Sequence, residues 1–380
     1  MFLKSKKIIG INYYYSKTYL TFKMIERYKK SAELDPNDAD AWINLADAYY
    51  DKNEYKEAIN AYQKAIELNP FFSEVWNNLG LTFSMLHQFE DAIECYQEAL
   101  KIEPDDAIAY YNMGFAYEDL EDYDNALKFY KIALEYEPSY SDVWNNIALI
   151  YREREKYEDA IECYKKAIKI NPDEQMLYNN LAIIYYDSKK FDEAIKIYKK
   201  ALDLDPNNAE LWFDLGDVAY EQSNNYELAI KCYKKATELN PNFIEAWNNL
   251  GLSYTFTGEY KQSIKCYEEA LKFQKEDVAL YENLAFSYSS LNDYDNAILY
   301  YQNTLKIDPD NTNALKKLGL LFCDVKNNYK EAIIQFEKAA SLDPSDVDFW
   351  ESAVSCHKKL GNFEKAKEWN EKGSKLKAND

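Results

Sequence analysis

Prolines recur at an almost constant interval along this 380-residue chain, and this spacing constrains its fold more than any other feature. Most neighbouring prolines lie 34 residues apart, and the remaining intervals are 35 residues or twice the basic length. The positions are Pro36, Pro70, Pro104, Pro138, Pro172, Pro206, Pro241, Pro309 and Pro344. Proline ends a helix because it lacks a backbone N–H and its ring clashes with the preceding turn. Breaks at one period therefore predict an array of similar helical units, which is typical of a solenoid.

Residues 39–72 show the pattern of one unit most clearly. Two sets of mostly apolar residues recur at spacings of three, four and seven, which predicts two amphipathic helices joined by a polar turn. The first set is Trp42, Leu45, Ala46 and Tyr49, and the second is Tyr55, Ala58, Tyr62 and Ala65. The second helix is expected to end before Pro70.

The same positions carry the same kinds of residue in ten successive units. The Tyr55 position is aromatic in every unit: Tyr55, Phe89, Tyr123, Tyr157, Phe191, Tyr226, Tyr260, Tyr294, Tyr329 and Phe363. The Ala58 position is alanine in all units except the one with Ser263, and glycine or alanine fills the Ala46 position until Val354. Small residues let two helices approach closely, while aromatic rings fill the space between hairpins.

These positions resemble the tetratricopeptide repeat (TPR), a helix–turn–helix unit, over roughly residues 20–380. The motif stands almost intact in one unit: Trp76, Asn77, Asn78, Leu79, Gly80, Phe83, Ala92, Tyr96, Ala99 and Pro104. The resemblance implies an all-α fold, a right-handed superhelical solenoid of about ten antiparallel helix–turn–helix hairpins.

The predicted organisation follows this register. It comprises an irregular segment 1–19, a degenerate half-repeat 20–38, nine TPR repeats 39–346 and a capping repeat 347–380 with Lys-rich sequence at its end. The repeats that begin at Ala209 and Thr312 each contain one extra residue, which we place in the turns around Asn224–Asn225 and Asn327–Asn328. Lys275 stands where proline is expected, which predicts a less sharply bent junction.

The composition indicates that the chain is folded and in which cellular compartment it is expected. A net charge of −21 is combined with 47% hydrophobic residues, which favours a folded chain over an acidic disordered one. Four of the six cysteines share one position of the second helix, a repeat or more apart, so we expect neither disulfides nor a metal site: Cys95, Cys163, Cys232 and Cys266. Free thiols fit a reducing compartment, which predicts a cytoplasmic protein. We expect no signal peptide and no contact with a membrane, since no apolar run reaches 18 residues.

The sequence contains no recognisable catalytic arrangement. The two histidines, His87 and His357, have no repeated acidic partner, and the nine glycines form no phosphate-binding loop. Aspartates gather at the loops between repeats, where helix capping explains them. The chain is therefore predicted to be no enzyme and to use no cofactor and no metal.

One polar position of the first helix repeats beside the apolar ones. Asn44, Asn78, Asn112, Asn146 and Asn180 are followed by Asp214, then by Asn249 and Asn283, before Lys317 and Ser352 break the series. An Asn amide offers two donors and an acceptor, so a row of them can bind the backbone of an extended peptide. The row resembles the asparagine ladder in the TPR arm of protein O-GlcNAc transferase, which implies a peptide-binding role for these seven amides. Asparagine is also common here in TPRs of every function.

A second, apolar position lies three residues further on. Its members are Leu81, Phe115, Leu149, Ile183, Leu252, Phe286 and Leu320, with Asp47, Asp217 and Ser355 as exceptions. These side chains either line the groove beside the amides or pack against the neighbouring hairpin. The difference matters because a neutral hydrogen bond contributes only about 0.5–1.5 kcal/mol, whereas ordering a ligand residue costs about 1–2 kcal/mol. Useful affinity therefore requires apolar burial or charge pairing as well.

Charge narrows the class of partner. An acidic array repels phosphate backbones, so nucleic acid is not expected and basic or neutral protein segments are favoured. The Lys, Arg and Asn clamp by which TPR co-chaperones hold a chaperone's C-terminal carboxylate is not matched. Lys316, Lys317, Lys358 and Lys359 form a local basic cluster, which is either a solvated cap or a docking point for an acidic tail.

Three functional hypotheses follow. The first is a scaffold that binds an extended protein segment along its inner groove. The second is a targeting arm or subunit of a glycosyltransferase. The third is a structural or oligomerisation module that self-associates through the aromatic segment Tyr13–Phe22.

Overall fold

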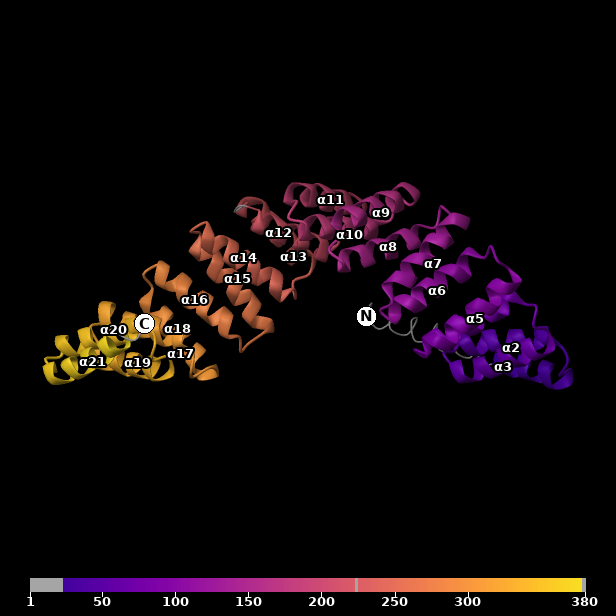
Figure 1. Cartoon of the computed structure of the whole chain (residues 1–380). Helices are drawn as coiled ribbons and strands as arrows, with labels where there is room; N and C mark the ends of the chain where they lie inside the picture. The colour runs from indigo at the N-terminus through magenta and orange to yellow at the C-terminus, as the bar shows by residue number, and fades with distance from the viewer. Residues whose placement is uncertain (1–22, 223–224, 378–380) are drawn as a thin grey trace, which may run out of the picture. The chain divides into compact units, whose positions relative to one another are not determined.

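The computed structural model describes residues 23–222 and 225–377, and within these ranges every regular element is a helix (Figure 1). The chain divides into two compact units between Leu177 and Tyr178. The predicted irregular segment 1–19 and the aromatic stretch Tyr13–Phe22 lie outside the described residues. No helix in the described part of the chain combines the length and the apolar character needed to cross a bilayer.

The first unit contains four helix pairs and a preceding helical segment. Residues 23–34 are helical and precede Pro36, where the sequence predicts the second half of a degenerate repeat. The helices that follow are α2 (Ala39–Asp51), α3 (Tyr55–Leu68), α4 (Ser73–Met85), α5 (Phe89–Ile102), α6 (Ala107–Asp119), α7 (Tyr123–Tyr136), α8 (Ser141–Glu153) and α9 (Tyr157–Ile170).

The second unit continues the alternation of first and second helices. Its first helix, α10, begins shortly before the division between the units. Its helices are α10 (Gln175–Asp187), α11 (Phe191–Leu204), α12 (Ala209–Glu221), α13 (Tyr226–Leu239), α14 (Ile244–Phe256), α15 (Tyr260–Phe273), α16 (Val278–Ser290), α17 (Tyr294–Ile307), α18 (Thr312–Leu320), the π-helical turn η1 (Leu321–Val325), α19 (Tyr329–Leu342), α20 (Val347–Lys359) and α21 (Phe363–Lys377).

Within each unit, consecutive helices pack in hairpins and neighbouring hairpins pack on one another, as α3 and α4 do in the first unit and α13 and α14 in the second. The even-numbered helices are the first helices of the repeats and the odd-numbered ones are the second helices. The interface between the first and second helices is built from the same residue types along the chain. The Ala58 position is buried wherever it is alanine, and the Tyr62 position is buried wherever it is tyrosine or phenylalanine. At Gly80, an added Cβ would lie 2.5 Å from the ring of Tyr96, so this close approach of the two helices requires glycine.

In seven repeats, a side chain at the start of the first helix closes the turn between repeats. The indole Nε1–H of Trp76 donates to the carbonyl oxygen of Pro70 at 3.0 Å. Tyr110 and Tyr281 replace tryptophan in two repeats, and their hydroxyls make the same bond to the carbonyl six residues earlier. For Tyr281 that carbonyl belongs to Lys275, at 2.6 Å, so the junction without proline keeps the same tether.

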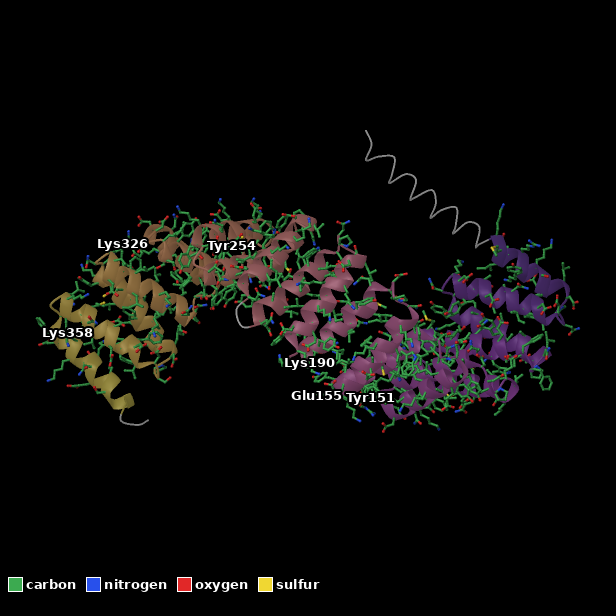
Figure 2. The ribbon with its side chains drawn as sticks, turned by 90° about the horizontal axis from the view of Figure 1, so that it is seen from above. Tyr151, Glu155, Lys190, Tyr254, Lys326 and Lys358 are labelled. Atoms are coloured by element: carbon green, nitrogen blue, oxygen red, sulfur yellow. The ribbon has the colours of Figure 1, made fainter. Side chains whose placement is uncertain are left out.

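In the hairpins whose turns the structure describes in full, the turn contains one residue with positive φ. Asn53 (φ 62°) and Glu155 (φ 55°, Figure 2) occupy this place in their repeats. Asparagine tolerates the left-handed conformation better than most residues do, and Gly258 fills the same place at φ 79°.

The structure corrects the predicted location of one extra residue. In the repeat that begins at Thr312, the positive-φ residue Asn327 is kept, and the additional residue is taken up before it in η1. There the N–H of Lys326 bonds to the carbonyl of Leu321, five residues back. The sequence placed this residue in the turn because turns normally accept insertions. In the repeat that begins at Ala209, α12 keeps the usual length and α13 starts at Tyr226, so the extra residue lies between them, with Asn224 outside the described residues.

Candidate peptide-binding surface

Within each unit, neighbouring first helices lie side by side, as α4 and α6 do in the first and α14 and α16 in the second. We define the amide column as Asn44, Asn78, Asn112, Asn146, Asn180, Asp214, Asn249 and Asn283. The apolar column is Leu81, Phe115, Leu149, Ile183, Leu252, Phe286 and Leu320. The two columns and the adjacent polar residues of the first helices form what we call the first-helix surface.

In the first unit, three members of the amide column donate hydrogen bonds within the protein: Asn44, Asn112 and Asn146. Asn112 is 7% exposed, and its Nδ2 donates to Oδ1 of Asn77 in the preceding repeat at 2.9 Å. The Nδ2 of Asn146 donates to the hydroxyl of Tyr130 at 3.2 Å. Asn44, at the start of the array, donates to the carbonyl of Asp40 in its own helix at 2.7 Å.

The second unit repeats this arrangement. The Nδ2 of Asn249 donates to Oδ1 of Asp217 at 3.0 Å, and that of Asn283 donates to Oδ1 of Asn248 at 3.4 Å. Each bond joins a first helix to the repeat before it. These amides therefore couple adjacent repeats, and a peptide that bound them would have to replace existing bonds. Their role in ligand binding stays a prediction.

The partners of these amides were not predicted from the sequence. Asn77 and Asn248 each precede a member of the amide column, and both accept a bond from the following repeat. In the sequence, these partners belong to pairs of adjacent asparagines, which occur at 77–78, 145–146, 179–180 and 248–249. In two of these four pairs, the first asparagine accepts a hydrogen bond from the following repeat.

Tyrosines of the second helices hold carboxylates on the first-helix surface. The hydroxyl of Tyr62 donates to Asp47 at 2.5 Å, that of Tyr130 to Glu118 at 2.6 Å, and that of Tyr233 to Asp217 at 2.6 Å. Burial raises the pKa of all three carboxyl groups. Asp47 and Asp217, which interrupt the apolar column, are thus fixed by the core beneath them.

Asp214 is the one carboxylate among the asparagines of the amide column. It is half-buried on α12, and burial, with the charges of Asp217 and Glu210 as further causes, raises its pKa to about 6. Part of the carboxyl is therefore still protonated near neutral pH, and a nearby cation would favour the charged form.

A cavity of about 260 Å³ opens between α2, α3 and α4. Its lining combines carboxylates, tyrosines, an amide and an apolar side chain: Asp47, Tyr50, Asp51, Tyr62, Asn78 and Leu81. Two members of the predicted site, Asn78 and Leu81, therefore meet at one cavity. Its chemistry suits a cationic or amphipathic side chain.

The members of the apolar column differ in burial. Leu81, Ile183 and Leu320 are partly buried and pack against the cores of their units. Phe115 and Phe286, in contrast, are 43% and 46% exposed. Part of the column thus belongs to the core, while the rings of its two phenylalanines are exposed, and a ligand-binding role for the column stays a prediction.

The charge of the first helices is almost entirely negative. Each of the eight first helices from α2 to α16 carries at least one Asp or Glu, and Arg152 on α8 is the one basic residue among them. Lysines gather instead on second helices such as α9 and α11.

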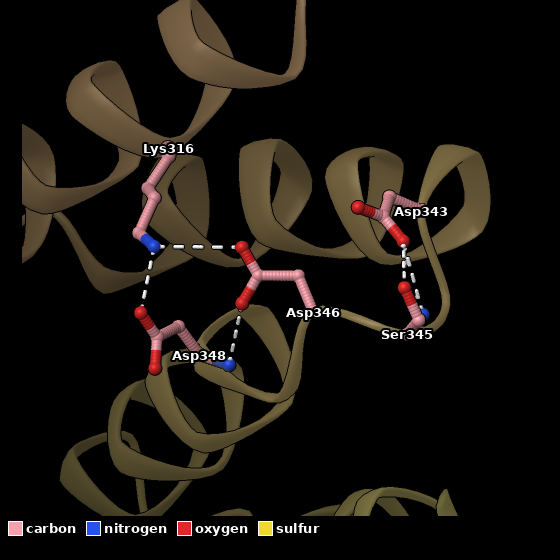
Figure 3. A network of polar contacts seen from close by, with 5 residues as sticks. All are labelled: Lys316, Asp343, Ser345, Asp346 and Asp348. Atoms are coloured by element: carbon pink, nitrogen blue, oxygen red, sulfur yellow. Dashed lines mark hydrogen bonds and ion pairs between the residues drawn. The ribbon is translucent and has the colours of Figure 1, made fainter. Parts of the chain in front are cut away.

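The basic cluster predicted near the C-terminus is partly neutralised. Lys316 on α18 bonds to Asp348 at 2.7 Å and to Asp346 at 3.5 Å, which ties it to the start of α20 (Figure 3). Lys359 lies 4.0 Å from Asp324. Lys358 is exposed (Figure 2). These ion pairs favour the solvated cap over a docking point for an acidic tail.

Larger hollows lie between the second helices of the first unit. One, of about 490 Å³, is lined by Trp42 and Leu45, and another, of about 860 Å³, by Trp76 and Leu79 at the equivalent positions. Because they recur in register, these hollows follow from the stacking of hairpins. In the described residues, no cluster of His, Cys, Asp or Glu has the composition of a metal site.

Comparison with known families agrees with this architecture. The model of the C-terminal domain of cilia and flagella-associated protein 70 matches residues 20–183. TPR and tetratricopeptide repeat models match residues 183–223, 219–255, 244–277, 278–311 and 322–346. No curated protein matches the chain.

A solved TPR structure shows the same fold. The C-terminal part of a TPR repeat-containing protein from Cytophaga hutchinsonii is similar with a TM-score of 0.52 and 18% identity, over 73% of this chain and 99% of that one. A MamA structure is similar over 44% of this chain and 97% of its own, with 28% identity and a TM-score of 0.42. YrrB, described as a TPR protein with an unusual peptide-binding site, covers 50% of this chain and 96% of its own at 23% identity and a TM-score of 0.43.

The fold and the repeat models together define the class of protein: a helical-repeat scaffold for protein interaction. The chain belongs to the tetratricopeptide repeat proteins.

Proposed function

We propose that this TPR protein is a non-catalytic scaffold that binds an extended, basic or neutral segment of a partner protein along its first-helix surface. The charge of that surface carries the proposal, because Arg152 is the one basic residue on the eight first helices from α2 to α16. A surface of one sign attracts segments of the opposite sign and speeds their association. The same charge opposes nucleic acid. The proposed role needs no cofactor and no membrane, and we place it in the cytoplasm.

The cavity of about 260 Å³ gives a basic side chain of the ligand a place to bind. A lysine or arginine there would meet the carboxylates of Asp47 and Asp51 and the ring of Tyr50. Bonds between a cation and a carboxylate are stronger than neutral ones, and an aromatic face adds a cation–π contribution.

Apolar contacts and amides complete the proposed binding mode. The exposed rings of Phe115 and Phe286 can bury apolar side chains of the segment in their respective units. The amide column, in contrast, contributes little net affinity, because Asn112 and Asn249 already donate within the protein. An exchange of neutral hydrogen bonds changes the binding free energy by no more than about 0.5–1.5 kcal/mol. The amides would orient the peptide backbone, while charge and apolar burial supply the affinity.

A pair of charge-reversed variants tests the location of binding. The first-helix variant carries Asp51→Lys and Asp119→Lys, at exposed positions of α2 and α6. The control carries Glu94→Lys and Glu135→Lys, at exposed positions of α5 and α7, so that the net charge changes equally. The probe is a fluorescent twelve-residue peptide that alternates lysine and leucine, and affinity is measured by anisotropy at physiological salt. Circular dichroism checks that both variants fold.

We expect the first-helix variant to weaken binding of the lysine–leucine peptide at least tenfold and the control to weaken it less than threefold. A glutamate–leucine peptide should bind neither protein measurably. If both variants lose affinity equally, binding follows total charge and the proposed surface is wrong. Failure of the wild-type protein to bind the lysine–leucine peptide would also contradict the proposal.

The purified wild-type protein also serves to test the two other hypotheses, a glycosyltransferase arm and an oligomerisation module. A glycosyltransferase arm predicts activity with a UDP-sugar and a peptide once the catalytic subunit is added. An oligomerisation module predicts sedimentation as a dimer or larger species without any peptide. The scaffold predicts binding in the absence of both.

A further inference from the structure

Two buried cysteines from neighbouring repeats meet near the C-terminus of the second unit. The Sγ atoms of Cys323 in η1 and Cys356 in α20 lie 3.0 Å apart. Cys323 is 5% exposed and Cys356 is fully buried. Within the described residues, this is the one contact between two cysteine sulfurs. Both thiols are free.

The extra residue of this repeat explains how the contact forms. Cys356 occupies a position that is buried in every first helix, as Thr82 and Ser253 are. Cys323 occupies one that is only half-buried elsewhere, as Ser84 and Thr255 are. The π-helical turn Leu321–Val325 widens the helix at this point, and Cys323 becomes part of the core shared with α19 and α20.

A lysine lies beside the more exposed sulfur. The Nζ of Lys359 is 3.8 Å from Sγ of Cys323 and 5.1 Å from the centre of the Tyr329 ring. A neighbouring cation favours the thiolate form of a cysteine, which is the form that reacts with an oxidant. Burial, in contrast, raises the pKa of Cys356 to about 12, so its thiol stays protonated. The two sulfurs are therefore chemically different, and Cys323 is the one that an oxidant reaches first.

We propose that Cys323 and Cys356 form a redox-sensitive thiol pair that peroxide converts to an intramolecular disulfide. A disulfide requires its sulfurs to approach to about 2.05 Å, about one ångström closer than they are now. The two cysteines come from different hairpins, so the bond would join the last two repeats covalently.

The reaction balances with hydrogen peroxide as the oxidant. The thiolate of Cys323 attacks one peroxide oxygen, the O–O bond breaks, and the products are a sulfenic acid at Cys323 and hydroxide. The Cys356 thiol then attacks the sulfenic sulfur, the S–O bond breaks, and its proton and the departing hydroxide form water. In total, two thiols and one peroxide give one disulfide and two waters.

The wild-type protein tests this directly. It is treated with hydrogen peroxide under native conditions, denatured, and titrated for free thiols, and its peptides are mapped by mass spectrometry without reduction. We expect two of the six thiols to disappear, a mass decrease of two hydrogens, and one cross-linked pair of peptides that contains Cys323 and Cys356. Reduction with dithiothreitol should restore all the thiols.

Variants give the matched controls. Cys323→Ser and Cys356→Ser should both prevent the loss of paired thiols, while Cys163→Ser, at another buried cysteine, should not. Lys359→Gln should slow oxidation at least threefold. The proposal is overturned if the native wild-type protein keeps all its thiols, if it forms sulfinic acid without a disulfide, or if the cross-linked peptides contain other cysteines. Peptide mapping of the wild-type protein decides the question even if a serine variant fails to fold.

Discussion

At the scale of single residues, the repeated motif is a set of contacts that different residues can make. The tether at the start of the first helices shows this, because Trp76 uses an indole N–H and Tyr110 a hydroxyl to reach the same carbonyl position. Both rings carry a donor at their far edge, whereas the repeat with Leu315 at this position has no such donor.

This tether predicts a difference between two substitutions of Trp76. Both Trp76→Tyr and Trp76→Phe lose the area of the indole, but only tyrosine can still donate to the carbonyl of Pro70. We expect the phenylalanine variant to be less stable than the tyrosine variant by about 1 kcal/mol, the net contribution of one hydrogen bond. Urea denaturation followed by circular dichroism measures the difference. Equal stabilities would show that the tether contributes nothing.

Asp214 predicts a pH dependence. Its folded pKa of about 6 lies above the value of 3.8 that is usual for the group, so the folded state binds its proton more tightly. The cost of ionising it is absent below pH 4, grows between pH 4 and 6, and is complete at pH 7. A difference of one in pKa corresponds to about 1.4 kcal/mol, so Asp214→Asn should stabilise the protein at pH 7 by up to about 3 kcal/mol and by nothing at pH 3.5.

Thermal unfolding of the wild-type and Asp214→Asn proteins at the two pH values measures this. Asp124→Asn, at an exposed carboxylate that pairs with Arg154, is the control and should not stabilise. A gain for Asp214→Asn that persists unchanged at pH 3.5 would mean that titration is not its cause.

At the scale of the element, the helices keep nearly the same length from repeat to repeat, and an extra residue is accommodated at a single point. The repeat that begins at Thr312 takes up its additional residue as the π-helical turn η1. Deleting Asp324, which is exposed, should restore a regular helix and withdraw Cys323 from Cys356. We expect this deletion variant to keep its thiols in hydrogen peroxide while its helicity by circular dichroism is unchanged. Disulfide formation at the wild-type rate would show that η1 does not position Cys323.

The capping helix pair predicts a stabilising substitution. His357 on α20 stands where most other repeats have an aromatic residue and is buried. Its Nε2 lies 3.6 Å from Oε1 of Glu337, too far for a hydrogen bond, and neither ring nitrogen has a hydrogen-bond partner. Burying unsatisfied polar atoms costs about 1–3 kcal/mol. His357→Phe should therefore raise the free energy of unfolding by about 1–2 kcal/mol, measured by denaturant titration. Exposed His87→Asn is the control, and a loss of stability in His357→Phe would contradict this explanation.

At the scale of the whole molecule, local periodicity made the repeats predictable. The proline spacing and the aromatic and alanine positions define the hairpins, because each of these residues acts within its own repeat or against the next. The amide column was also found from the sequence, but its bonds were not. Whether Asn112 meets Asn77 or a ligand depends on how two helices from successive repeats are rotated. The contact between Cys323 and Cys356 depends on a π-helical turn, and no residue type in the sequence predicts such a turn.

The most direct test of the central claim, that the acidic first-helix surface binds an extended basic segment, is photo-cross-linking. The lysine–leucine peptide carries a benzophenone at its centre, and mass spectrometry identifies the cross-linked residues. The binding mode predicts cross-links on first helices such as α4, α6 and α8, with Phe115 among the labelled positions, and their loss in the variant with Asp51→Lys and Asp119→Lys. Cross-links that fall mainly on the second helices α3, α5 and α7 would contradict it.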